Sequence, residues 1–184
     1  MLKGFVMYWA MAAAGASLTS CGDSAAGGGK PTEAEMKSNA KRDASALAAA
    51  MVAADWNTTI KYMPRRLVDM MGGDEGIKKT FLKGTAEMDS QGFGFHSSTV
   101  GEPEQLQEID GLHVLKVPQR TEMKAPGGRL VSNGWLLGVS GNSGRDWVFI
   151  DMVKLSNETL PKIYPEFSGR ITFPEKKPPV FEKD

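Results

Sequence analysis

The spacing of apolar residues changes once along the chain, near Gly92. Before that point apolar residues recur every three or four positions, as in amphipathic helices, and after it they alternate, as in strands with one buried face. Helices followed by strands that tight turns connect are typical of an α+β domain. We therefore expect an α+β fold in which N-terminal helices pack on a curved antiparallel sheet.

Local signals give the expected boundaries of these elements. Thr32 and Glu35 have the spacing of a capping box at the start of the first helix. Pro64 interrupts the second helix, and Gly127 follows a proline in a turn that is typical of type II. We expect helices over 32–55, 57–63, 65–71, 74–91 and 156–164, and strands over 93–100, 112–117, 130–140 and 147–152.

The segment from Ser140 to Trp147 resembles the Asp-box hairpin, Ser-x-Asp-x-Gly-x-Thr-Trp, which is repeated in sialidase propellers. Two positions differ, with Asn142 in place of Asp and Asp146 in place of Thr. The segment occurs once, whereas a propeller needs many blades. We interpret it as a hairpin turn in which Gly144 has a positive φ, and not as a sign of glycosidase activity.

The first residues resemble a bacterial lipoprotein signal. Lys3 precedes a run of apolar and small residues over 4–17, which is shorter than the roughly 20 residues that span a bilayer. Leu18-Thr19-Ser20-Cys21 is similar to the lipobox, and Cys21 is the only cysteine of the chain. The resemblance implies that Cys21 receives a diacylglycerol and that cleavage frees its amine for acylation. The alternative is a soluble secreted protein with a free cysteine.

These features predict the organisation of the whole chain. The membrane is the expected partner, through the acyl chains on Cys21, and the expected location is the bacterial cell envelope. Gly22, rather than Asp, follows the cysteine, which in a Gram-negative cell favours the outer membrane, facing the periplasm. We expect a signal peptide over 1–20, a flexible tether over 21–31, an α+β domain over 32–172 and an extended tail rich in Pro and Lys over 173–184.

The order and lengths of the expected elements resemble the nuclear-transport-factor-like family, also described as a cystatin-like cone. Asp55-Trp56, the break at Pro64, Met70-Met71-Gly72-Gly73 and the stretch 147–151 carry the resemblance, which covers about 32–164. It implies a cone-shaped sheet with helices on its concave side. The alternative is another fold of sheet and helices, such as a pleckstrin-like barrel, in which the helix comes last.

A pocket is expected between the first helices and the concave face of the sheet, lined by Tyr62, His96, Trp135 and Asp151. The small residues of the first helix cannot fill a curved sheet everywhere, which leaves room for larger side chains or for an apolar ligand. The family resemblance implies that a buried Asp151 can act as a general base. Alternatively, Asp151 caps the next turn or pairs with Lys154. His96 and His113 can share a face if their strands pair, or they are ordinary sheet histidines.

Charge and motifs exclude several classes of function. The chain has 22 basic and 22 acidic residues, so it lacks the positive charge of nucleic-acid-binding proteins. It contains no short motif for a serine nucleophile, a zinc site or a nucleotide phosphate, and we expect no metal and no cofactor. We predict a domain that binds a small apolar ligand or a protein partner without catalysis. Two alternatives stay open: an isomerase, dehydratase or hydrolase that uses a buried Asp, and an inhibitor or immunity protein against an envelope enzyme or toxin.

Overall fold

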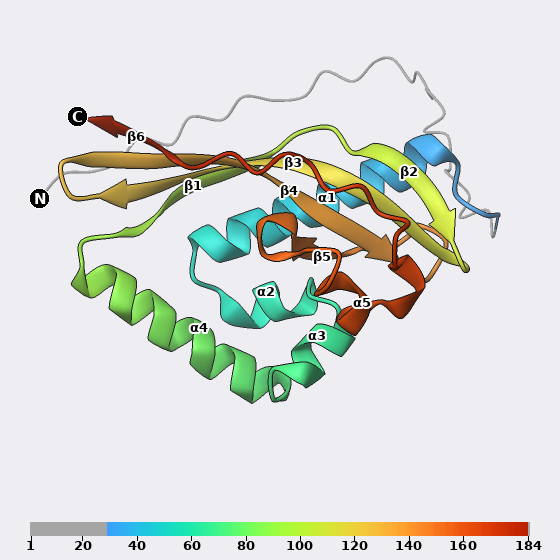
Figure 1. Cartoon of the computed structure of the whole chain (residues 1–184), viewed down its shortest axis with the longest axis horizontal. Coiled ribbons are helices and arrows are strands. Elements are labelled where there is room, and N and C mark those ends of the chain that lie inside the picture. Colours follow the sequence, from blue (N-terminus) through green and yellow to red (C-terminus); the bar gives the residue numbers. More distant parts are fainter. Residues whose placement is uncertain (1–28, 184) are drawn as a thin grey trace, which may run out of the picture.

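A computed structural model describes residues 29–183 as helices followed by a sheet (Figure 1). Cys21 and the expected signal peptide lie outside the described residues. The order of elements confirms the predicted α+β fold, with N-terminal helices packed on a curved antiparallel sheet. The elements are α1 (Glu33–Val52), α2 (Trp56–Lys61), α3 (Arg65–Met70), α4 (Gly73–Ser90), β1 (Gly94–Val100), β2 (Glu104–Ile109), β3 (Leu112–Ala125), β4 (Gly128–Ser140), β5 (Val148–Asp151), η1 (Met152–Lys154), α5 (Leu160–Ile163), η2 (Pro165–Phe167) and β6 (Val180–Lys183).

The sheet is open and entirely antiparallel. Its main order is β1-β3-β4-β5, with β2 paired to β3 and β6 paired to β4. The long β3–β4 hairpin is in register from Ala125 opposite Gly128 to His113 opposite Ser140. Strands β5 and β6 pair with different halves of β4. The open sheet and the leading helices do not fit the barrel alternative, in which the helix comes last.

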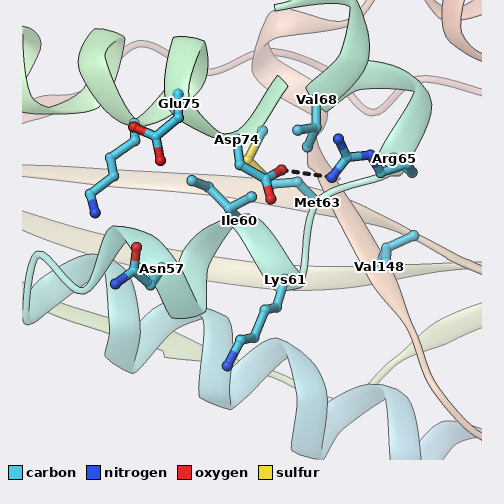
Figure 2. A pocket seen from close by; sticks show the side chains of 10 residues that line it. Asn57, Ile60, Lys61, Met63, Arg65, Val68, Asp74, Glu75 and Val148 are labelled. Atoms are coloured by element: carbon cyan, nitrogen blue, oxygen red, sulfur yellow. Dashed lines mark hydrogen bonds and ion pairs between the residues drawn. The ribbon is translucent and has the colours of Figure 1, made fainter. Parts of the chain in front are cut away.

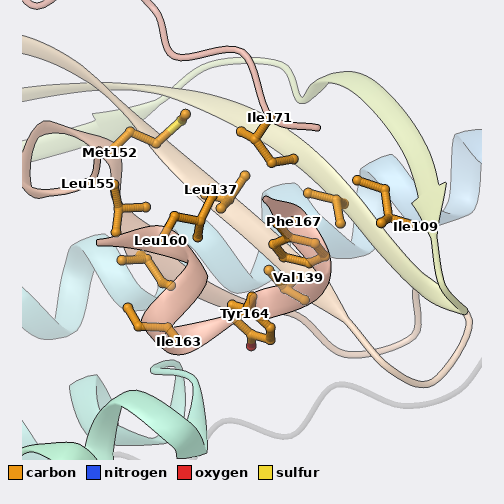
Figure 3. Close-up of a cluster of buried hydrophobic side chains, with 12 residues drawn as sticks. Ile109, Leu137, Val139, Met152, Leu155, Leu160, Ile163, Tyr164, Phe167 and Ile171 are labelled. Atoms are coloured by element: carbon orange, nitrogen blue, oxygen red, sulfur yellow. The ribbon is translucent and has the colours of Figure 1, made fainter. Parts of the chain in front are cut away.

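Both faces of the sheet are covered by other parts of the chain. Successive side chains of a strand point to opposite faces, so neighbouring residues of one strand pack against different layers. On the inner face, which is the face toward α1, Leu115 and Leu136 pack with α1. On the opposite, outer face, Val114 and Leu137 pack with the C-terminal segment 155–171. The described residues therefore form three layers: α1, the sheet and the C-terminal segment (Figures 1 and 3).

The packing of α1 on the sheet depends on small residues and on one buried carboxylate. Ala40 and Ala44 are completely buried, which lets the helix approach the strands closely. The predicted capping box is present, and Thr32 Oγ1 accepts from the backbone N–H of Glu35. The carboxylate of Asp43 is buried and accepts a hydrogen bond from the backbone N–H of Trp147 at 3.0 Å. This bond connects α1 to the loop before β5.

The loop over residues 140–147 is the predicted hairpin turn. Gly144 has a φ of +76°, as the resemblance implies. Its N–H donates to Ser140 Oγ at 3.0 Å, and its carbonyl accepts from Trp147 Nε1 at 3.1 Å. Asn142 bonds both Ser140 and Asp146 through its side chain, so the residue that replaces Asp still closes the turn.

Several local features differ from the expectations. Asp55 caps α2, which begins at Trp56 rather than at 57, and Gly72, with a φ of +90°, precedes α4, which begins at Gly73 rather than at 74. The tail runs extended over most of its length, but its last residues form β6, which the sequence pattern does not indicate. Lys176 Nζ donates to the carbonyls of Val153 and Leu155, which fixes the middle of the tail against η1.

Tyr164 belongs to the buried cluster on the outer face of the sheet, which we call the outer cluster. Its ionisation is expected to make the stability of the domain depend on pH. Burial raises the pKa of its phenol from 10 to about 12, despite the opposing effect of nearby Arg66. Between pH 10 and about 12 the unfolded chain loses this proton and the folded chain keeps it, so the folded state loses about 1.4 kcal/mol per pH unit. We expect urea unfolding to show this loss in the wild-type chain and a smaller loss in Tyr164→Phe. Identical pH profiles for the two chains above pH 10 would contradict the assignment.

Candidate ligand-binding groove

A groove of about 470 Å³ opens between α2, α3, the start of α4 and the first residue of β5 (Figure 2). Its size falls in the range of about 300–1,000 Å³ that is usual for small-molecule sites. Ten residues line it: Asn57, Ile60, Lys61, Met63, Arg65, Val68, Asp74, Glu75, Lys78 and Val148.

The floor of the groove is apolar. Val68 from α3 is almost completely buried, and Ile60 from α2 is buried beside it, in a cluster that includes Ile77 from α4. Met63 packs against the same cluster, and Val148 contributes from β5. These side chains come from four different elements, so the groove depends on how the helices are placed.

Two local features place the helices around the groove. Pro64 separates α2 from α3 and changes the direction of the chain, since proline disfavours a helical residue before it. The backbone N–H of Phe149 donates to the carbonyl of Tyr62 at 2.7 Å, which fixes the end of α2 beside β5. The sequence break at Pro64 thus positions the apolar residues on either side of it.

The rim of the groove is charged. Arg65 donates to Asp69 at 2.8 Å and to Asp74 at 2.6 Å, and these hydrogen bonds raise the pKa of its guanidinium. Lys61 and Lys78 also line the groove, and the ammonium of Lys78 has no partner within residues 29–183. Figure 2 shows Asp74 on the side formed by α4, whereas the side chain of Lys61 extends from α2 away from α4, and its charge acts on Asp55.

The four residues of the pocket expected from the sequence do not come together. Tyr62 is partly buried and packs against the inner cluster, on the side of α1. Trp135 is partly buried against the outer cluster, on the opposite side of the sheet. Because the sheet lies between these two side chains, they cannot line one pocket, and this part of the prediction is wrong.

His96 and Asp151 are also not pocket residues. His96 is exposed and lies where the register of β1 shifts between Phe95 and Ser97. The carboxylate of Asp151 accepts from the backbone N–H of Val153 at 2.8 Å and caps η1. This is the alternative role considered for Asp151, so a buried carboxylate that could act as a base is absent at this position.

The two histidines do not form a site. His96 lies opposite the far end of β3, near Glu122, whereas His113 is at the start of β3. Nine residues of strand separate these positions, or about 30 Å. His113 is buried, with Nδ1 unpartnered and Nε2 3.5 Å from a Glu108 carboxylate oxygen. Within the described part of the chain, no group of three or more His, Cys, Asp or Glu side chains could hold a metal ion.

Comparisons with known proteins found no matching family model, no matching curated protein and no matching solved structure. The resemblances to bacterial lipoproteins and to the nuclear-transport-factor-like family therefore stay predictions. Among residues 29–183, no helix has the length and apolar character that crossing a bilayer requires.

Proposed function

We propose that this chain is a lipid-anchored protein of the bacterial cell envelope whose domain binds a small apolar ligand with an acidic end group, without catalysis. The observation that carries this proposal is the groove with an apolar floor and the unpartnered ammonium of Lys78 at its rim. A medium- or long-chain fatty acid has the matching chemistry, since it combines an apolar chain with one carboxylate.

The apolar floor supports the first half of the proposal. Ile60 and Val68 belong to a buried cluster, and Met63 is an unbranched side chain that adapts to irregular shapes. Each methylene that an apolar ligand removes from water contributes about 0.8 kcal/mol. A chain of several methylenes in this groove therefore has enough driving force to bind.

The charges at the rim support the second half. Asp69 and Asp74 neutralise Arg65, so this cation is occupied. The three cations Arg65, Lys61 and Lys78 are balanced in number by the three acids Asp69, Asp74 and Glu75, but the ammonium of Lys78 has no partner within residues 29–183. A ligand carboxylate at the rim would accept a charge-assisted hydrogen bond from this ammonium. An apolar ligand that carries an acid is therefore favoured over a neutral one.

The lining of the groove favours binding over catalysis. General acid–base chemistry needs two groups that can exchange protons next to the substrate. The groove contains no histidine and no cysteine among its lining residues, and of its two carboxylates Asp74 is held by Arg65, which leaves only Glu75. Asp151, the base that the family resemblance implies, caps η1 instead.

A photoactivatable decanoic acid tests the proposal. The probe is incubated for a few minutes with the purified full chain in nanodiscs and is then irradiated. It should cross-link to peptides that contain residues 57–63 or 148. We expect Lys78→Glu to reduce this labelling about tenfold, because it replaces an attraction by a repulsion at the rim. The matched control is Lys79→Glu, which reverses the exposed neighbouring charge outside the groove.

Two results would contradict the proposed function. One is equal labelling of the Lys78→Glu and Lys79→Glu chains, since the amine at the rim would then play no role. The other is labelling confined to peptides that do not line the groove. Circular dichroism of each variant shows that its fold is retained, which we expect because Lys78 is only partly buried and Lys79 is exposed.

A further inference from the structure

We propose a second binding site, on the outer face of the sheet, that binds a neutral saccharide against the indole ring of Trp135. This site is separate from the groove between the helices, and the inference does not depend on what that groove binds. The site lies between strands β1, β3 and β4 and the C-terminal tail, and its volume is about 470 Å³. The residues on which the proposal depends are Thr99, Pro118, Arg120, Asn133, Trp135 and Glu175.

Strand register brings these side chains to one face. Thr99 of β1 lies opposite Arg120 of β3, and Arg120 lies opposite Asn133 of β4. Pro118 of β3 lies opposite Trp135 of β4 in the same ladder. Directly paired residues of an antiparallel sheet point to the same side. The five residues therefore form a continuous surface across three strands.

The floor of the site is apolar and partly exposed. Pro118 and Trp135 present two adjacent rings, and Trp135 is only partly buried. Gly101 lies over Pro118, and a Cβ added to it would come within 2.9 Å of the proline Cγ. A side chain at position 101 would thus crowd the floor, and glycine keeps it accessible. The apolar C–H face of a sugar ring can stack on such a surface.

Polar groups with unused hydrogen-bonding capacity surround this floor. The hydroxyl of Thr99, the amide of Asn133, the carboxylate of Glu175 and the indole Nε1–H of Trp135 have no hydrogen-bond partner within residues 29–183. They offer both donors and acceptors, because an amide both donates and accepts, a carboxylate only accepts and an indole only donates. Sugar hydroxyls donate and accept, so they can satisfy this mixture.

The charges around the site favour a neutral ligand. Arg120 donates to Glu122 at 2.6 Å, so its charge is balanced. Glu175 and Lys177, on the tail, have opposite charges. A phosphate or a strongly anionic ligand would find no net positive charge here. A polyhydroxylated, uncharged ring fits both the polar groups and the absence of net charge.

The C-terminal tail completes the site. It crosses the outer face of the sheet on its way to β6 (Figure 1), and it brings Glu175 next to strands that lie 40 or more residues earlier. The two hydrogen bonds from Lys176 Nζ to η1 fix the tail at this point. The wall formed by Glu175 is therefore held in place before a ligand binds, which lowers the entropy cost of binding.

Saturation-transfer NMR with three disaccharides, maltose, cellobiose and diacetylchitobiose, tests this inference. The full chain is used in a detergent without a sugar headgroup. We expect transfer to the ring protons of at least one disaccharide. Trp135→Ala should weaken its binding about tenfold, and Trp135→Phe should retain most of it, because the stacking surface is kept. Lys78→Glu, in the other groove, should leave sugar binding unchanged.

A second variant keeps the test valid if Trp135→Ala destabilises the outer cluster. Asn133 and Glu175 are exposed, so Asn133→Ala combined with Glu175→Ala should leave the fold intact and weaken binding by a similar factor. Absence of transfer to all three disaccharides in the wild-type chain would overturn the proposal. Undiminished transfer in the Asn133→Ala/Glu175→Ala chain would overturn it as well, since the sugar would then bind elsewhere.

Discussion

Replacing Gly144 by valine should destabilise the domain by about 3–5 kcal/mol, which is a large part of the roughly 5–15 kcal/mol that keeps a domain folded. Two costs add at this position. The φ of +76° is one that β-branched residues resist. In addition, a Cβ would lie 2.4 Å from Met36 Cγ on α1, which is far inside van der Waals contact.

The surroundings of Gly144 leave no way to relieve this contact. Its carbonyl accepts from Trp147 Nε1 and from Asn39 Nδ2, and its N–H donates to Ser140 Oγ. A shift of the loop would break these bonds, and a shift of α1 would disturb the buried inner cluster to which Met36 belongs. Urea unfolding of the full chain, monitored by tryptophan fluorescence, measures the loss.

Gly127, in the β3–β4 turn, is the matched control. Its φ of +77° is nearly the same, but nothing lies within 4 Å of an added Cβ. Gly127→Val should therefore show only the conformational cost, about 1–2 kcal/mol. If the two variants lost the same free energy of unfolding, the contact with Met36 would contribute nothing to the loss. If the contact matters, the loss in Met36→Ala/Gly144→Val should be smaller than the sum of the two single losses.

Most of the elements could be predicted because their patterns are local. The small residues of α1, the break at Pro64 and the turn at Gly127 each depend on neighbouring residues only. Strand β2 could not, because its register shifts between Glu104 and Gln107 and interrupts the alternation of apolar residues. Strand β6 pairs with β4 through its backbone and leaves Val180 and Phe181 exposed, so no apolar pattern indicates it.

The prediction of the pocket is wrong because the alternation of apolar residues predicts a sheet with one buried face, whereas both faces are covered. Leu136 and Leu137 are consecutive and are both buried, as are Val114 and Leu115. A continuous apolar run of this kind indicates a strand that is covered on both faces. The layer that covers the outer face comes from residues 155–171, whose helices are only a few residues long. Because consecutive residues of β4 point to opposite faces, Leu136 faces α1 and Trp135 faces the other side of the sheet.

The groove between the helices could not be identified from the sequence for a different reason. Ile60 and Val68 have the spacing of ordinary core residues, and they are in fact buried. Whether such a cluster borders solvent or another layer depends on the angle between α2, α3 and α4, which tertiary contacts determine. Lys61, Arg65 and Lys78 lie close in sequence to these apolar residues, and charged side chains mark the edge of an apolar cluster. This proximity is the sequence signal that could have indicated the groove.

The largest effect on the function of the chain should come from Cys21→Ala, which we expect to abolish acylation. The expected diacylglyceryl group is attached through a thiol, and Cys21 is the only cysteine in the sequence, so no other side chain can replace it. A single acyl chain gives marginal membrane binding, whereas two or three chains make the anchor effectively permanent. Without any of them, the proposed envelope protein loses its attachment to the membrane.

Metabolic labelling with a clickable palmitate measures this effect. The wild-type chain should carry the label, and the Cys21→Ala chain should carry none and should keep the mass of the unprocessed precursor. Ser20→Gly is the matched control, because it changes the neighbouring residue to another small one and leaves the thiol in place. It should be labelled and processed like the wild type. Equal label in the wild-type and Cys21→Ala chains would show that the acyl chains are attached elsewhere, and the proposed anchor would then be wrong.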